Sequence, residues 1–142
     1  MPAGIYISVP FCRSKCSFCN FASGVFSREK MDRYVARVQE DVEGAGDSVR
    51  GFGVVLDREA DSLYLGGGTP STLSSDQLAR IFDALRNSFR LQPGSEITVE
   101  CAPGTLSSKI INALVTSGVN RVSLGVQSFM DKEAAAVGRL HT

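Results

Sequence analysis

The amino-terminal part of the chain joins an apolar run to a group of cysteines, and reads Tyr6-Ile7-Ser8-Val9-Pro10-Phe11-Cys12-Arg13-Ser14-Lys15-Cys16-Ser17-Phe18-Cys19-Asn20. The apolar run is typical of a buried strand, and Pro10 ends it. Three of the 4 cysteines of the chain then follow at C-x3-C-x2-C spacing. Because so short a loop cannot place three thiols on separate faces, we predict that they converge on one iron–sulfur cluster or one metal ion.

Three cysteine ligands leave one coordination position open. In an iron–sulfur cluster, the open iron can take an exogenous ligand, which a reactive cluster requires. Zinc accepts the same ligands, with either His141 or Cys101 as its fourth. Cys101 lies inside a predicted strand, where a small buried side chain is the alternative interpretation, and free cysteines elsewhere are often core residues.

Length and charge restrict the class of protein. With 142 residues, the chain is expected to form one domain at most. Lys+Arg and Asp+Glu are balanced at 15 each, so the charge gives no support to binding of nucleic acid or an acidic membrane. No apolar segment reaches the about 18 residues of a membrane span, and no cleavable leader is recognised. We therefore expect a cytoplasmic protein, whose cysteines are ligands rather than disulfides.

Strand-like and helix-like segments alternate along the chain. Strands are predicted over residues 4–9, 62–65, 96–101 and 121–126. Helices are predicted to begin at the N-cap residues Ser27, Ser74, Ser107 and Asp131, with a looser connection over residues 44–60. Ser74 and Gln77 form a capping-box pattern, and Gly118 is placed to end a helix as a left-handed C′ residue. The alternation predicts an α/β fold with a parallel sheet of about three and a half βα units.

The carboxyl ends of parallel strands meet at one edge of the sheet, so residues that follow each strand are expected to converge there. The cysteine loop, the glycine run Gly66–Gly68, Glu100 and Gln127 each stand at such a position. Each has a plainer alternative: the glycines as a tight turn, Glu100 as a surface carboxylate, and Gln127 and Arg139 as solvated side chains. The glycine run is not a Walker loop, because no Gly-Lys-Ser/Thr follows it.

Several ordered motifs resemble the radical S-adenosylmethionine (SAM) superfamily, and within it the oxygen-independent coproporphyrinogen III oxidase-like branch. The resemblance runs from the first predicted strand to the end of the chain. The matching segments are residues 6–12, Cys12-x3-Cys16-x-Phe18-Cys19, residues 66–71, residues 96–100, residues 118–129 and residues 138–141. It implies a partial (β/α) radical SAM barrel, of which residues 1–142 are the amino-terminal part. Family members are longer, so the remainder of the barrel and a carboxyl-terminal domain are expected to be absent from this chain.

The resemblance also implies a set of cofactor ligands. Cys12, Cys16 and Cys19 would hold a 4Fe–4S cluster, whose open iron would bind SAM. The residues implied to contact the cluster or SAM are Tyr6, Phe18, Gly67, Gly68, Thr69, Glu100, Gln127 and Arg139. A reduced cluster would then cleave SAM to give a 5′-deoxyadenosyl radical, while the protein orients the reacting bond.

Two branches of the family imply different functions. The decarboxylating enzymes, which oxidise the propionates of coproporphyrinogen III, carry a further cysteine where this chain has Phe21. That difference favours the heme chaperone branch, whose members bind heme and deliver it to acceptor proteins, and in which oxidase activity is doubtful. Heme or porphyrin, and a heme-acceptor protein, are therefore the expected partners. A zinc-stabilised binding module is the third interpretation.

Overall fold

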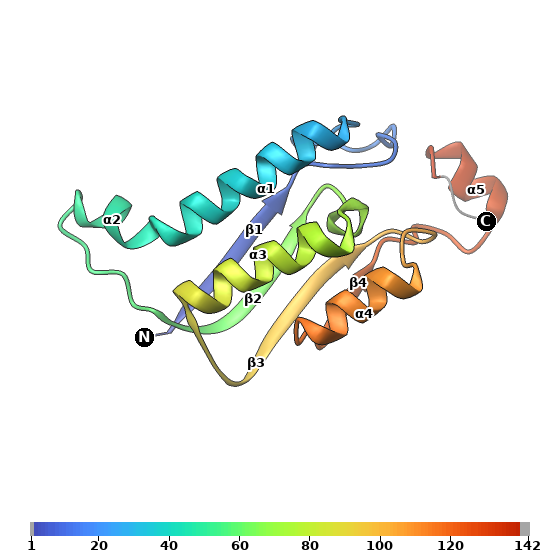
Figure 1. Cartoon of the computed structure of the whole chain (residues 1–142). Coiled ribbons are helices and arrows are strands. Elements are labelled where there is room, and N and C mark those ends of the chain that lie inside the picture. The colour runs from blue at the N-terminus through green and yellow to red at the C-terminus, as the bar shows by residue number, and fades with distance from the viewer. Residues whose placement is uncertain (1, 140–142) are drawn as a thin grey trace.

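The structure, a computed structural model, describes residues 2–139 (Figure 1). Its sheet contains the strands β1 (Ala3–Val9), β2 (Glu59–Gly67), β3 (Arg90–Cys101) and β4 (Arg121–Leu124). The strands lie side by side in the order β1-β2-β3-β4, and every neighbouring pair is parallel. The predicted α/β class and parallel sheet are therefore confirmed.

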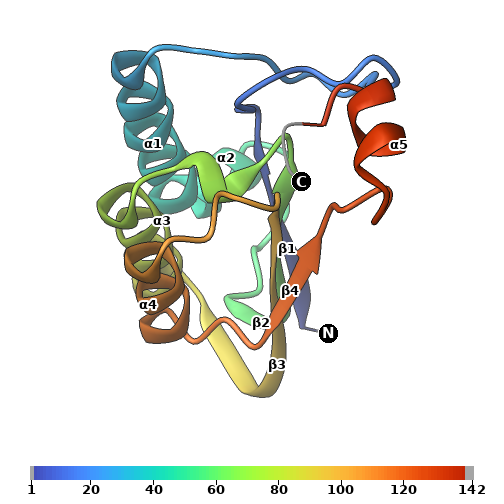
Figure 2. The ribbon, with the colours of Figure 1, turned by 90° about the vertical axis from the view of Figure 1, so that its right-hand side faces the viewer.

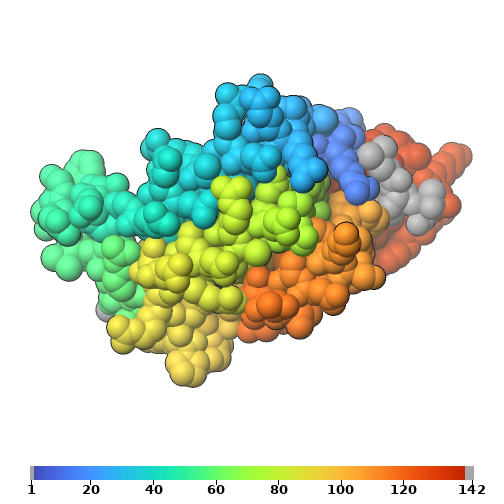
Figure 3. All heavy atoms as spheres, in the orientation of Figure 1, coloured from blue at the N-terminus to red at the C-terminus, as the bar shows by residue number. Residues whose placement is uncertain are grey.

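Helices connect the strands and cover one face of the sheet. The helical segments are α1 (Arg28–Glu43), α2 (Ala45–Arg50), the 3-10 turn η1 (Pro70–Thr72), α3 (Ser75–Ser88), α4 (Ser108–Thr116) and α5 (Asp131–Ala136). Figure 2 shows α1, α3 and α4 stacked on the same side of the sheet, and Figure 3 shows them side by side across one face of the molecule. The other face of the sheet has no such layer among the described residues, and α5 lies beyond the carboxyl ends of the strands.

The core fills the space between the sheet and the helices. Val35 and Val38 of α1 and Ile81 and Phe82 of α3 are buried there. Alternate residues of β1 face this layer, since Val9 is fully buried whereas Tyr6 is 57% exposed. Tyr6 consequently belongs to the open face of the sheet, because successive side chains of a strand point in opposite directions.

Side-chain caps fix the beginnings of the three main helices. The hydroxyls of Ser27, Ser74 and Ser107 each accept a hydrogen bond from a backbone N–H in the first turn, as predicted. Ser74 and Gln77 form both hydrogen bonds of the capping box. These caps satisfy N–H groups that have no partner within the helix.

The carboxyl end of α4 has the predicted glycine termination. Gly118 has a φ of 72°. Its N–H donates to the Val115 carbonyl at 2.9 Å, and the Val119 N–H donates to the Leu114 carbonyl at 3.0 Å. This pair of bonds is the Schellman pattern, which requires the left-handed conformation that glycine adopts without strain.

Several details of the prediction are wrong. β3 begins at Arg90 rather than at residue 96, and β4 ends at Leu124 rather than at residue 126. Residues 44–60 are not only a loose connection, because they contain α2, and β2 already begins at Glu59. Asp131 is not the N-cap of α5 but its first residue, and the N-cap position, Met130, makes no side-chain cap bond. The Ser128 hydroxyl instead accepts from the Met130 N–H and donates to the Glu133 carboxylate, so Ser128 organises the turn that leads into α5. No helix in residues 2–139 is long and apolar enough to cross a membrane.

Candidate cofactor site

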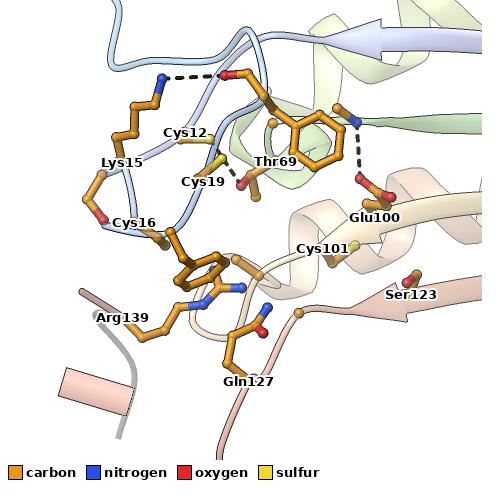
Figure 4. Close-up of a pocket in the computed structure, with 17 residues that line it drawn as sticks. Cys12, Lys15, Cys16, Cys19, Thr69, Glu100, Cys101, Ser123, Gln127 and Arg139 are labelled. Atoms are coloured by element: carbon orange, nitrogen blue, oxygen red, sulfur yellow. Dashed lines mark hydrogen bonds between the residues drawn. The ribbon is translucent and has the colours of Figure 1, made fainter. Parts of the chain in front are cut away.

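A cavity of about 220 Å³ lies at the carboxyl ends of the strands, between the cysteine loop and the sheet (Figure 4). Its lining comes from the cysteine loop, the ends of β2, β3 and β4, and the segment that follows β4. The lining residues are Cys12, Ser14, Lys15, Cys16, Phe18, Cys19, Phe21, Gly67, Gly68, Thr69, Glu100, Cys101, Ala102, Ser123, Gly125, Gln127 and Arg139. The predicted convergence of strand ends is therefore confirmed.

The cysteine loop forms one wall of the cavity. The Cys12 N–H donates to the Gly24 carbonyl at 2.9 Å, and the Cys19 N–H donates to the Cys16 carbonyl at 3.1 Å, so both ends of the loop are held by backbone bonds. All three cysteines are free thiols and partly exposed. Within residues 2–139, however, no three metal-ligating side chains are gathered closely enough to form a metal site. The three thiols nevertheless line one cavity. The cysteines of a 4Fe–4S cluster bind different irons, so they are spaced more widely than the ligands of a single metal ion.

The glycine turn at the end of β2 is hydrogen-bonded to the segment that leads into the cysteine loop. The Gly68 N–H donates to the Val9 carbonyl at 2.7 Å, and the Thr69 N–H donates to the Phe11 carbonyl at 2.6 Å. A Cβ at Gly68 would lie 2.7 Å from the Phe11 carbonyl oxygen, so no larger residue fits without displacing the backbone. The Thr69 hydroxyl also donates to Cys12 Sγ at 3.7 Å. The glycines therefore bring the turn against the segment that leads into the first cysteine.

Glu100 presents its carboxylate to the cavity from β3. Oε2 accepts a hydrogen bond from the Gly67 N–H at 3.1 Å, and Oε1 accepts one from the Tyr64 hydroxyl at 2.7 Å. Figure 4 shows the carboxylate directed toward the glycine turn. A carboxylate has about four acceptor positions, so Glu100 keeps free capacity for a ligand's N–H or O–H groups.

Gln127 and Arg139 line the opposite side of the cavity. Gln127 is the one residue other than glycine with a positive φ among residues 2–139, at 71°. Such a conformation is costly for a residue with a Cβ, and strained residues of this kind cluster at active sites and ligand-binding sites. Arg139 Nε is buried and has no hydrogen-bond partner in the described structure. An anionic group of a ligand would satisfy this donor.

The structure brings together all but one of the predicted site residues. Tyr6 does not line the cavity: its ring stacks on Tyr64 on the open face of the sheet, with ring centroids 5.7 Å apart. Cys101 is buried, as the alternative for it predicted, yet it also lines the cavity, and burial raises the pKa of its thiol. His141, the other proposed fourth zinc ligand, lies outside the described residues.

Sequence reasoning missed several lining residues. Ser123 stands at the end of β4, so the rule that strand ends converge could have identified it. Lys15 lies between Cys12 and Cys16, and Phe21 follows Cys19 by two positions. The Lys15 ammonium donates to the Phe21 carbonyl at 3.4 Å. Tyr64, the partner of Glu100, had no signal in the sequence.

The residues present fit an iron–sulfur cluster with SAM. Three thiols are the usual donors for a cluster with one open iron. Glu100 can accept hydrogen bonds from a ligand's ammonium or hydroxyl groups, and the unpartnered Arg139 Nε can donate to its carboxylate. Ligand pockets typically have volumes of about 300–1,000 Å³, and this cavity is smaller. It can therefore enclose only part of a ligand that fills a typical pocket.

Comparison with known proteins identifies the family. The model of the radical SAM superfamily matches residues 6–142, so the chain belongs to this superfamily. Proteins of this superfamily generally use a 4Fe–4S cluster together with SAM.

The individual relatives have different names and functions. The chain is 36% identical to the heme chaperone HemW of Lactococcus lactis, over 99% of this chain and 35% of that protein. It is 37% identical to the anaerobilin synthase of Escherichia coli O157:H7, over 90% of this chain and 28% of that protein. The solved structure of the coproporphyrinogen III oxidase HemN of Escherichia coli superposes with a TM-score of 0.85 at 29% identity, covering 99% of this chain and 31% of HemN.

The fold matches the corresponding part of the HemN radical SAM barrel. The chain spans about a third of the length of these proteins. The first name refers to heme and the third to coproporphyrinogen III, and percentage identity alone does not separate the three proteins.

Proposed function

We propose that this chain is the cluster- and SAM-binding part of a heme chaperone-like radical SAM protein that acts in heme trafficking in the cytoplasm. The observation that supports this most strongly is the single cavity lined by Cys12, Cys16 and Cys19 together with Glu100 and Arg139. In this proposal the three thiolates hold the cluster. When bound, the cluster supplies one electron for the reductive cleavage of SAM.

The protein's own residues would orient SAM. Glu100, fixed by two donors, accepts hydrogen bonds from the ammonium or ribose hydroxyls of SAM, and Arg139 donates to its carboxylate. Gly67, Gly68 and Thr69 supply a turn without bulky side chains, so that the ligand can approach the backbone closely. Phe18 and Gln127 complete the lining, whereas Tyr6 would contribute from the neighbouring open face.

The presence of Phe21 favours a chaperone function over an oxidase function for this protein. Its side chain lines the cavity at the position where the sequence resemblance places a further cysteine in decarboxylating enzymes. A phenyl ring can neither exchange protons nor ligate iron, so it cannot replace that thiol. The proposal therefore expects binding of heme without oxidation of coproporphyrinogen III.

Electron paramagnetic resonance tests the cofactor part of the proposal. The chain is reconstituted anaerobically with iron and sulfide, reduced with dithionite, and measured with and without SAM, beside a metal and sulfide assay. We expect a 4Fe–4S signal that changes when SAM is added, and loss of that signal in Cys16→Ser. Cys101→Ser is the matched control, because Cys101 is the cysteine outside the loop, and it should keep the signal.

The remaining outcomes separate the alternatives. Bound zinc without sulfide would establish the zinc module and refute the radical SAM assignment for this site. For the complete protein encoded by the gene, stoichiometric heme binding without turnover supports the chaperone. Loss of carbon dioxide from coproporphyrinogen III, with formation of 5′-deoxyadenosine, would instead establish the oxidase.

A further inference from the structure

We propose that Tyr64 is a positioning residue, whose hydroxyl holds the Glu100 carboxylate in the orientation in which it receives the ammonium or hydroxyl groups of the bound ligand. This inference rests on the proposed function, because it takes Glu100 to be a contact of SAM. Tyr64 does not itself line the cavity, whereas Glu100 does. Tyr64 therefore acts on a ligand through the lining residues that it contacts, and Glu100 is the one that its hydroxyl holds at 2.7 Å.

Two hydrogen bonds determine how the carboxylate lies. The Tyr64 hydroxyl donates to Oε1 at 2.7 Å, and the Gly67 N–H donates to Oε2 at 3.1 Å. With one donor on each oxygen, rotation of the carboxylate would break both bonds. The bond from Gly67 comes from the backbone, so a side-chain substitution does not remove it. The bond from the Tyr64 hydroxyl is the one that a substitution can remove.

The sheet register brings Tyr64 and Glu100 together. Tyr64 of β2 is paired with Thr98 of β3, and Glu100 follows Thr98 by two positions on the same face. Neighbouring strands lie about 4.8 Å apart and rise about 3.3 Å per residue, so such diagonal neighbours are roughly 8 Å apart at their backbones, within reach of long side chains. The Tyr64 ring is held from its other side by Tyr6, stacked at an interplanar angle of 20°.

Gly66 leaves space for this pair. A Cβ at Gly66 would lie 2.7 Å from Cε1 of Tyr64 and 3.0 Å from Cδ of Glu100. Any larger residue would therefore push the phenol and the carboxylate apart. The first glycine of the run thus serves the Tyr64–Glu100 contact, while Gly68 serves the contact with the cysteine loop.

The phenol is a donor at neutral pH. Its hydrogen bond to Glu100 is the largest influence that raises the pKa of Tyr64, followed by burial, while a hydrogen bond with Ser123 opposes the shift. Tyr64 consequently remains protonated, and its proton is directed to Glu100. A neutral donor reduces the spread of carboxylate orientations without cancelling the charge that attracts an ammonium group.

Tyr64→Phe tests the inference, because it removes only the hydroxyl. The readout is the dissociation constant of SAM, measured from the SAM-induced change in the resonance signal of the reduced, reconstituted chain, together with the melting temperature. We expect the dissociation constant to rise about three- to tenfold, which corresponds to the net contribution of one ordinary hydrogen bond, because the lost bond acts on the ligand indirectly. In the Glu100→Gln background, where binding is already weakened, the same change should have little further effect.

Tyr34→Phe is the matched control. The Tyr34 hydroxyl donates to the Ser8 carbonyl at 2.6 Å, remote from Glu100, and burial raises its pKa to about 12, so it is also a neutral donor. It therefore loses an equivalent hydrogen bond. We expect a lower melting temperature with an unchanged dissociation constant for SAM.

The outcomes distinguish this inference from the proposed function. If the unmodified chain holds a cluster whose resonance signal does not change when SAM is added, the proposed function is refuted. The proposed role of Tyr64 is then refuted as well. If SAM changes the signal but Tyr64→Phe binds it as tightly as the unmodified chain, only the inference about Tyr64 is overturned. An equal loss of affinity in both backgrounds, or Glu100→Gln with normal affinity, would also overturn it.

Discussion

At the scale of single residues, Gln127 combines backbone strain with a place in the cavity. Its φ of 71° is a conformation that glycine adopts freely and alanine does not. We predict that Gln127→Gly is more stable than Gln127→Ala by about 1 kcal/mol, because both lack the amide but only glycine relieves the strain. Both variants should weaken SAM binding to the same extent.

Thermal melts and SAM titrations of the two variants check this prediction together. The alanine variant is the control for loss of the amide, and the glycine variant isolates the backbone. Equal stabilities would mean that the positive φ is not maintained in solution. Unchanged SAM affinity in both would exclude the Gln127 amide from the binding site.

The sequence predicted most of the cavity because its residues follow strand ends. Cys12, Glu100 and Gln127 each stand directly after, or at the end of, an apolar run, so their convergence follows from a parallel sheet. Tyr64 could not be predicted in this way. Its contact with Glu100 depends on the register between β2 and β3 and on space beside Gly66, and neither is visible in a single sequence.

At the scale of elements, the capping box does more than begin α3. The Gln77 side chain accepts from the Ser74 N–H and also donates to Asp32 of α1 at 2.6 Å, so it links two neighbouring helices of the layer. We predict that Ser74→Ala lowers the free energy of unfolding by about 1 kcal/mol, the usual cost of losing an N-cap hydroxyl.

Denaturant unfolding measures this difference. Ser75→Ala is the control: Ser75 is the first residue of α3, the cap bond belongs to its neighbour, and alanine is a good helix former. We expect the control to be neutral or slightly stabilising. A loss of similar size in both variants would point to a general effect of the first turn rather than to the cap.

Helix beginnings were predicted better than strand beginnings, and the reason is chemical. Ser27, Ser74 and Ser107 act through local hydrogen bonds, which leave a signal in the sequence. By contrast, β3 extends back to Arg90 through Pro93 and Gly94, residues that interrupt a strand pattern. Its early part pairs at Arg90 and Leu91 with β2, and the register then shifts, so pairing with a neighbour rather than local preference sets its length.

At the scale of the whole molecule, the surface along the edge strand β4 and the neighbouring helix α4 is markedly apolar. Val122 and Leu124 of β4 are 46% and 47% exposed, and Val115 of α4 is 68% exposed. The sheet order leaves β4 with a neighbour on one side only within the described residues. An exposed edge with apolar side chains is a template for association.

We therefore predict that the isolated chain of 142 residues is marginally stable and self-associates. Size-exclusion chromatography with light scattering should give a mass that rises with protein concentration. Replacing Val122 and Leu124 by lysine should shift the chain toward the monomer, because charge on an edge strand opposes pairing.

Val55→Lys separates this effect from a general gain in solubility. Val55 is 93% exposed but lies in the connection between α2 and β2, away from β4, so the added charge should leave the association unchanged. A chain that is monomeric at all concentrations and melts cooperatively would contradict the prediction. In that case the chain would remain folded and monomeric with the apolar surface of β4 and α4 exposed to water. The stability of the cofactor cavity would then not depend on burying that surface.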